Sequence, residues 1–119
     1  MELKDIKSVY FVGAGGIGMS AIARYFLHIG VVVAGYDKTP SALTKELEKE
    51  GMDIHYEENV ALIPAACKDA SSTLVIYTPA IPQEHQELVY FHENGFTIEK
   101  RAQVLGTLTR SHKGLCVAG

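Results

Sequence analysis

The chain has 119 residues, of which 47% are hydrophobic and 21% charged, with a formal net charge of −3 at pH 7. This length suits a single domain with a buried core, so we expect residues 1–119 to form one domain. The charges form no basic stripe and no run of about 18 apolar residues occurs, which argues against nucleic-acid and membrane partners. Because the N-terminus also lacks a signal-peptide pattern, we expect a cytoplasmic location.

Strands and helices alternate along the first half of the chain. Residues 8–12 are a β-branched and aromatic run that ends in glycines, which predicts a buried strand entering a turn. Residues 17–29 are apolar on nearly all sides and predict a helix buried against a sheet. Residues 31–36 predict a second strand. A narrow apolar stripe then predicts a second helix between the N-cap candidate Ser41 and Gly51.

The second half repeats this alternation. A short third strand is expected at residues 52–56, and a short helix around residues 60–63 within a weakly patterned segment. The remaining strands are expected at residues 73–77, 96–98 and 115–118, and the remaining helices at residues 83–94 and 100–111. The order predicts an α/β fold: a Rossmann-like, doubly wound, mainly parallel sheet with helices on both faces.

Residues 13–18 read Gly-Ala-Gly-Gly-Ile-Gly, a G-x-G-x-x-G pattern directly after a predicted strand and directly before a predicted helix. The first glycine permits a tight turn, the second leaves room for a diphosphate, and the third lets the helix pack on the strand. The free N–H groups at the helix start then face the anion. The pattern predicts a diphosphate-binding loop, with a purely structural turn as the alternative.

Asp37 lies 19 residues beyond Gly18, at the end of the second predicted strand. In dinucleotide-binding domains an acid near this position accepts hydrogen bonds from ribose hydroxyls. A solvated carboxylate or a helix N-cap is the alternative. Lys38 and Thr39 are placed to reach a base or a sugar edge, or else to remain exposed loop residues.

A proline-rich loop follows the predicted strand at residues 73–77. It reads Thr78-Pro79-Ala80-Ile81-Pro82. Ligands of open α/β sheets bind at this carboxyl rim, and the two prolines fix the backbone at little ordering cost. The loop is therefore either part of a ligand site or simply a rigid turn.

The other polar residues suggest no chemistry. Cys67 and Cys116 have neither a CxxC nor a zinc-ligand spacing and are expected to be reduced and buried. The histidines have no metal-ligand spacing, and most are expected to be solvated, with His85 on an exposed helix face together with His92. Glu87, with Glu84, is expected on a solvated helix face. The sequence therefore nominates no catalytic residue and no metal ligand.

Four strings resemble a known family in the same order and spacing. They are VGAGGIGMSAIA at residues 12–23, TPAI at residues 78–81, KRAQVL at residues 100–105 and VAG at residues 117–119. Together they resemble the N-terminal domain of the Mur ligases, in particular of those that add L-alanine to UDP-N-acetylmuramic acid. In that family the Val-Ala-Gly string leads into the phosphate loop of an ATP-binding domain. The resemblance thus implies the N-terminal part of a longer ligase, cut just before that loop.

The resemblance also implies a division of labour. The N-terminal domain of such ligases binds the UDP part of UDP-N-acetylmuramic acid, and a central domain uses ATP and Mg²⁺ to activate the substrate carboxylate. A C-terminal domain helps to bring in the amino acid, and an amide bond forms. We therefore expect no cofactor in this domain, partner domains in the same longer chain, and no catalysis by the fragment alone.

The resemblance assigns substrate contacts to three groups of residues. The glycine loop with Met19 and Ser20 faces the diphosphate, the Asp37 turn lies along the uridine, and residues 78–81 close over it. Arg101 orients the ligand or the domain junction, with a helix-capping role equally open. The assigned set is Gly13, Ala14, Gly15, Gly16, Ile17, Gly18, Met19, Ser20, Asp37, Lys38, Thr39, Thr78, Pro79, Ala80, Ile81 and Arg101.

The chain departs from the family pattern in one loop. Family members often have Ser-Ser-Ala-Ile where this chain has Thr78-Pro79-Ala80-Ile81, so the resemblance does not fix the side-chain contacts of that loop.

Two alternatives remain open from the sequence. A sister ligase that recycles murein tripeptide has a similar N-terminal domain. From another class, an NAD-binding domain of a dehydrogenase, or a regulatory nucleotide-sensing module, would use the same glycine loop and the same acid.

Overall fold

The computed structural model describes residues 5–13, 19–78, 81–82 and 84–100. The strands are β1 (Ser8–Val12), β2 (Val32–Tyr36), β3 (Asp53–His55), β4 (Thr73–Tyr77) and β5 (Thr97–Lys100). The helices are α1 (Met19–His28), α2 (Ala42–Lys49) and α3 (Gln86–Glu93), with short 3₁₀ helices η2 (Val60–Leu62) and η3 (Ala65–Cys67).

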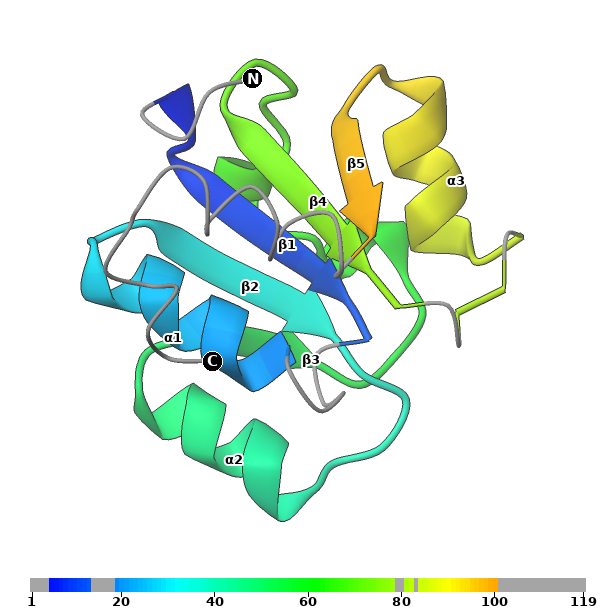
Figure 1. The fold of residues 1–119 in the computed structure, drawn as a ribbon. Coiled ribbons are helices and arrows are strands. Elements are labelled where there is room, and N and C mark those ends of the chain that lie inside the picture. Colours follow the sequence, from blue (N-terminus) through cyan, green and yellow to red (C-terminus); the bar gives the residue numbers. More distant parts are fainter. Residues whose placement is uncertain (1–4, 14–18, 79–80, 83, 101–119) are drawn as a thin grey trace.

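The strands form one five-stranded sheet in the order β3-β2-β1-β4-β5, and every neighbouring pair is parallel (Figure 1). From the central strand β1 the chain winds first through β2 and β3 to one edge, and then returns through β4 and β5 to the other. The strand order reverses between β1 and β4, which makes that point the topological switch of the sheet. The predicted α/β, Rossmann-like fold is confirmed.

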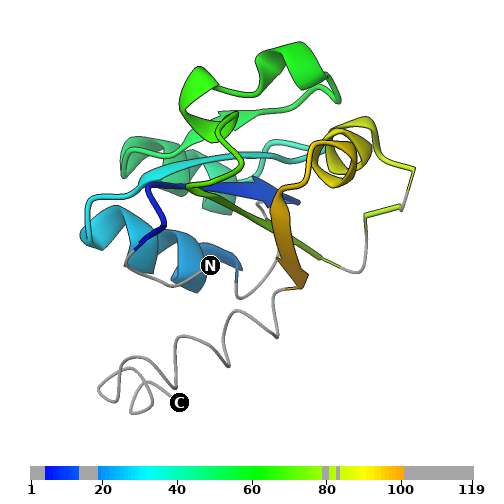
Figure 2. The ribbon, with the colours of Figure 1, turned by 90° about the horizontal axis from the view of Figure 1, so that it is seen from above.

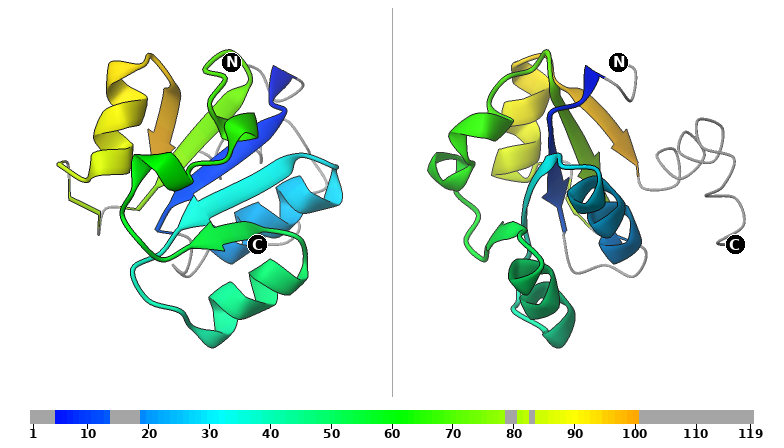
Figure 3. Two further views of the ribbon diagram at one scale, coloured as in Figure 1. Left: turned by 180° about the vertical axis from the view of Figure 1, so that it is seen from behind. Right: turned by 90° about the vertical axis from the view of Figure 1, so that its left-hand side faces the viewer.

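The two halves of the core lie on opposite faces of the sheet. Val9 and Phe11 of β1 pack with α1 and α2 on one face, whereas Tyr10 and Val12 pack with α3 and η3 on the other. This alternation follows from the pleat of a strand, and it explains why β1 is buried along its whole length. In Figure 2 and in the right-hand view of Figure 3, α1 lies on one side of the sheet and the 3₁₀ helices lie on the other.

Local sequence accounts for the limits of the helices on the first face. The buried residues of α1 include Ile22, Ala23 and Phe26, a spacing that gives a helix one apolar stripe. A capping box begins α2: the Ser41 hydroxyl accepts the Thr44 N–H at 3.2 Å, and the Thr44 hydroxyl accepts the Ser41 N–H at 2.8 Å. No helix in the described part of the chain is long and apolar enough to cross a membrane.

The short helix expected around residues 60–63 is present as the 3₁₀ helix η2, and it ends before Pro64, whose backbone is extended with φ −59° and ψ 147°. A second 3₁₀ turn, η3, follows Pro64. Two other expectations from the sequence need correction. Helix α3 starts at Gln86 rather than at residue 83, with His85 as its N-cap. Strand β5 continues to Lys100 because it pairs with β4 up to Tyr77, so the last predicted helix cannot begin at residue 100. Residues 101–111 and the strand expected at 115–118 lie outside the described residues.

Candidate functional site

The carboxyl ends of β1 and β4 meet at the switch point of the sheet. Val12 of β1 is in register with Tyr77 of β4, so the next residues, Gly13 and Thr78, leave the sheet side by side. Gly13 has a φ of +99°, a conformation that L side chains rarely adopt, and its N–H donates to the Tyr36 carbonyl at 2.8 Å. The first glycine of the loop therefore makes the turn for which the sequence pattern requires it.

The structure brings two separate sequence motifs into contact here. A Cβ atom added to Gly13 would lie 3.1 Å from Thr78 Oγ1 and 3.4 Å from Ile81 Cγ1. The loop that follows β4 thus lies directly against the beginning of the glycine loop. Such crevices at the switch point are where ligands of open α/β sheets bind.

The turn at Asp37 forms the third part of the rim, beyond the end of β2. The Asp37 N–H donates to the His55 carbonyl at 3.1 Å, which ties the turn to the end of β3. One carboxylate oxygen of Asp37 accepts the Thr39 N–H at 3.3 Å. Asp37 is half-buried, while Lys38 and Thr39 are exposed, so this edge of the rim is open to a ligand from solvent.

Of the other predicted site residues, the structure describes Met19 and Ser20. Met19, at the start of α1, is fully buried in the core, so its side chain packs against the sheet. Ser20 is half-buried. Several predicted site residues lie outside the described residues: Ala14, Gly15, Gly16, Ile17, Gly18, Pro79, Ala80 and Arg101.

A buried polar network lies beneath the rim, and the sequence analysis missed it. Glu87 is fully buried, and its carboxylate accepts a hydrogen bond from the Tyr10 hydroxyl. The same carboxylate lies 2.8 Å from His55 Nε2 and accepts the Asn59 N–H at 3.1 Å. Burial and the neighbouring Glu87 carboxylate raise the pKa of Tyr10 well above its usual value, because the phenolate would be both desolvated and repelled.

The structure corrects the solvated roles expected for Glu87 and His85. Because α3 starts at Gln86, Glu87 falls in its first turn on the same buried face as Leu88, toward the sheet. His85 is also buried, and its ring packs against the Tyr36 ring with centroids 4.7 Å apart. The sequence gives one signal for this network: these residues follow predicted parallel strands, and the carboxyl ends of parallel strands lie along the same edge of the sheet. By contrast, Cys67 is free and buried, as predicted.

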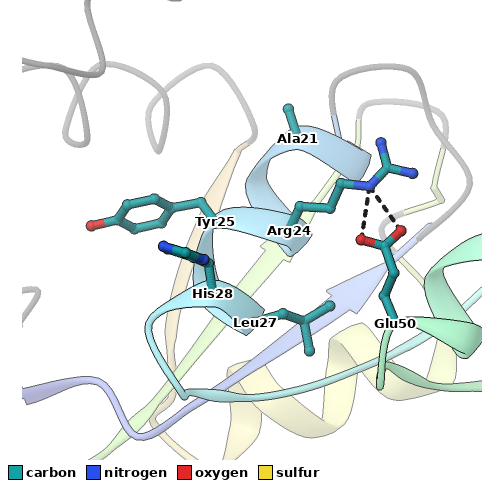
Figure 4. Close-up of a pocket in the computed structure, with 6 residues that line it drawn as sticks. All are labelled: Ala21, Arg24, Tyr25, Leu27, His28 and Glu50. Atoms are coloured by element: carbon teal, nitrogen blue, oxygen red, sulfur yellow. Dashed lines mark hydrogen bonds and ion pairs between the residues drawn. The ribbon is translucent and has the colours of Figure 1, made fainter.

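A separate hollow lies on the outer side of α1. It has a volume of about 560 Å³ and is lined by Ala21, Arg24, Tyr25, Leu27, His28 and Glu50 (Figure 4). Within it, Arg24 Nε lies 2.9 Å from a carboxylate oxygen of Glu50, so its charged groups already pair with each other. Since the hollow runs along the helix away from the carboxyl ends of the strands, we place the candidate site at the switch-point rim instead.

Comparisons with family models and with known sequences point to the same family. The model described as "Mur ligase family, catalytic domain" matches residues 8–113. A UDP-N-acetylmuramate–L-alanine ligase from Parabacteroides distasonis is 63% identical over 119 residues, which make up 100% of this chain and 26% of that protein. The chain thus spans about a quarter of the length of the curated relatives that it matches.

Solved structures agree with this result. The UDP-N-acetylmuramate–alanine ligase of Thermotoga maritima superposes with a TM-score of 0.75 at 31% identity, over 88% of this chain and 23% of that one. A murein peptide ligase of Psychrobacter arcticus gives a TM-score of 0.70 at 20% identity, over 87% of this chain and 20% of that one, a likeness of fold alone. On the family match and the shared fold together, the chain belongs to the Mur ligase family.

Proposed function

We propose that this chain is the substrate-binding N-terminal domain of an ATP-dependent ligase that joins L-alanine to UDP-N-acetylmuramic acid in peptidoglycan synthesis. The observation that carries the proposal is the contact between Gly13 and Thr78 at the switch point, in a chain of this family. The names of the relatives support the choice of L-alanine over the murein-peptide ligases, because the sequence relatives described above are L-alanine ligases and the murein-peptide likeness extends only to the fold.

The UDP moiety would lie along the rim described above. Its diphosphate would contact the loop of residues 13–18 and the start of α1 at Met19 and Ser20, where helix N–H groups attract anions. Its ribose would donate hydrogen bonds to Asp37, with Lys38 and Thr39 beside the base. Residues 78–81 would close the other side, and Arg101 would orient the ligand or the domain junction.

The rest of the reaction belongs to other parts of the proposed ligase. ATP and Mg²⁺ would be bound by a central domain, and the amino acid by a C-terminal one, in a cytoplasmic enzyme without nucleic-acid or membrane partners. The described residues of this chain contain no group of three His, Cys, Asp or Glu side chains placed to hold a metal ion. As part of this proposal, we assign this chain substrate binding and no step of the chemistry.

Calorimetric titration of the chain with UDP-N-acetylmuramic acid, UDP and NAD tests the proposal. We expect saturable binding of both UDP compounds and no heat from NAD. Replacing Asp37 by Ala should weaken UDP binding about 10- to 150-fold, since hydrogen bonds to a charged group are worth about 1.5–3 kcal/mol. Glu93→Ala, at an exposed position on α3, is the matched control. Binding of NAD alone, or hydrolysis of Mg-ATP by this chain, would contradict the proposal.

A further inference from the structure

Two segments on opposite sides of the rim are joined by a reciprocal pair of hydrogen bonds. One carboxylate oxygen of Glu58, after β3, accepts the Gln86 N–H at 2.9 Å, at the start of α3. In the opposite direction, Glu87 of α3 accepts the Asn59 N–H at 3.1 Å. We refer to these four residues as the carboxylate clasp. Each segment supplies one carboxylate and one backbone donor, so the two bonds run in opposite directions between the same two segments.

A histidine side chain faces each carboxylate of the clasp. His55 Nε2 lies 2.8 Å from a carboxylate oxygen of Glu87, and His85 Nε2 lies 3.6 Å from one of Glu58. The ring of Tyr36 packs against both histidine rings, with centroid distances of 5.8 Å and 4.7 Å. The end of β2 is thereby held between the two halves of the clasp.

Glu87 is the fixed half of the clasp. Its carboxylate is fully buried and has only acceptor atoms, and Tyr10, His55 and Asn59 direct polar hydrogens toward it. Without access to water, the carboxylate depends on these partners for its solvation. A group held from β1, β3 and the following loop in this way has one well-defined position.

Backbone hydrogen bonds connect the clasp to both sides of the proposed nucleotide site. On one side, the His55 carbonyl accepts the Asp37 N–H at 3.1 Å. On the other, the His85 N–H donates to the Pro82 carbonyl at 3.1 Å, and the Ile81 N–H donates to the Thr78 carbonyl at 3.1 Å. The clasp therefore lies between the Asp37 turn and the segment that contacts Gly13.

We propose that the carboxylate clasp sets the distance between the two sides of the nucleotide rim, so that Glu58 and Glu87 are positioning residues for UDP. This inference rests on the proposed function for its ligand, and on the contacts above for its geometry. Neither carboxylate needs to touch the ligand. They act by holding the Asp37 turn and the Thr78 side of the rim at a fixed separation. The conformational entropy that UDP binding would otherwise lose in ordering these two segments is then smaller.

Three variants at the exposed half of the clasp test this role by calorimetric titration with UDP. Glu58→Ala removes the acceptor for the Gln86 N–H and should weaken UDP binding about fivefold, the effect of one lost hydrogen bond. Glu58→Gln keeps an acceptor oxygen and should bind like the unmodified chain. Glu57→Ala, at an exposed neighbour with no hydrogen-bond or ion-pair partner among the described residues, is the matched control. Unchanged binding by Glu58→Ala, or an equal loss with Glu58→Gln, overturns the proposal.

Amide hydrogen exchange without ligand tests the geometry independently of UDP. In Glu58→Ala, and in Glu87→Gln, the amides of Asp37 and Ile81 should exchange about fivefold faster. The Met52 amide, bonded to the Leu47 carbonyl at 3.0 Å on the other face of the sheet, should keep its rate. Equal acceleration at all three amides, or at none, contradicts a positioning role. Failure of the unmodified chain to bind UDP would instead overturn the proposed function, while the exchange rates would still decide the role of the clasp.

Discussion

Tyr10 places a phenol group in the middle of the sheet, where its ring packs against Phe91 with centroids 5.1 Å apart. Its hydroxyl donates to Glu87 and also lies 3.0 Å from His55 Nε2. The ring contributes apolar contact, and the hydroxyl contributes a hydrogen bond that replaces water at the buried carboxylate. These two contributions can be separated, because removing the hydroxyl leaves the ring in place.

Tyr10→Phe should lower the free energy of unfolding by about 1.5–3 kcal/mol, the range for hydrogen bonds to charged groups. The loss arises because Glu87 would keep its burial but lose a donor. Urea unfolding at pH 7 measures it. Tyr77→Phe serves as the control, since the described residues give the half-buried Tyr77 hydroxyl no hydrogen-bond partner. Equal stability of Tyr10→Phe and the unmodified chain would contradict the role given to the hydroxyl.

Cys67 should make stability depend on pH in the alkaline range. Burial raises the pKa of its thiol from 9.0 to about 11. Because the folded-state pKa is the higher one, its contribution is fully present below pH 9.0 and is lost as the pH rises toward 11. The expected slope from this group is about 1.4 kcal/mol per pH unit. Urea unfolding between pH 7 and 10 measures this effect. The free energy of unfolding should decline more steeply with pH for Cys116→Ser than for the double variant Cys67→Ala, Cys116→Ser.

At the scale of the elements, Gly35 of β2 lies so close to β1 and to Met52, which follows α2, that no larger residue fits there. A Cβ atom on Gly35 would lie 2.8 Å from the Phe11 carbonyl oxygen and 3.0 Å from Met52 Cε. The Met52 side chain fills the space above Gly35 and packs β3 against β2 on the α1 face of the sheet. The glycine therefore serves strand packing, and its backbone has no positive φ.

Gly35→Ala should lower the free energy of unfolding by about 1–3 kcal/mol, the usual cost of an overpacked core. The added methyl group would push against a backbone oxygen, which cannot turn aside as a flexible side chain can. Thermal or urea unfolding measures the change. Val32→Thr, at an exposed position at the start of the same strand, should stay within about 0.5 kcal/mol. Equal free energies of unfolding for Gly35→Ala and Val32→Thr would contradict the prediction, and would mean that β1 and β2 can move apart to accept the added methyl group.

How far the sequence predicts each element depends on where its stability comes from. β1 and α1 were predicted because their apolar residues repeat at strand and helix periods, which is a local property. The second 3₁₀ turn, η3, is not predicted, because this segment is held by tertiary contacts: the Asn59 N–H donates to Glu87, and Ile63 is buried in the core on the α3 face of the sheet. The rim contacts of Gly13 and Asp37 could be anticipated from a motif, whereas burial of Glu87 depends on donors up to 77 residues away.

At the scale of the whole molecule, the fold presents its candidate ligand contacts from β1, β2 and β4, which are central in the sheet. A ligand held between the ends of these strands binds only the folded chain. Binding should therefore be linked to the stability of the entire sheet rather than to one loop.

UDP at 100 times its dissociation constant should stabilise the chain by about 2.7 kcal/mol, and NAD at the same concentration should not. For a domain of this size 2.7 kcal/mol corresponds to a rise in Tm of about 10 °C, read by differential scanning fluorimetry. Gly13→Val should abolish the shift, since a side chain at a φ of +99° would be strained and would press on Thr78 Oγ1. A UDP-dependent shift that survives in this variant would place the ligand elsewhere.

The central position of β1 also determines when the rim is completed during synthesis. β1 carries the turn at Gly13, but its neighbour β4 comes much later, and the paired hydroxyls of Ser8 and Thr73 are 65 residues apart in the chain. A nascent chain on the ribosome can thus pair β1 with β2 early, while the β4 side of the rim is still unsynthesised. If the rim binds nucleotide as proposed, capture has to wait until α3 and the Glu87 carboxylate have emerged, long after the Gly13 turn has been synthesised.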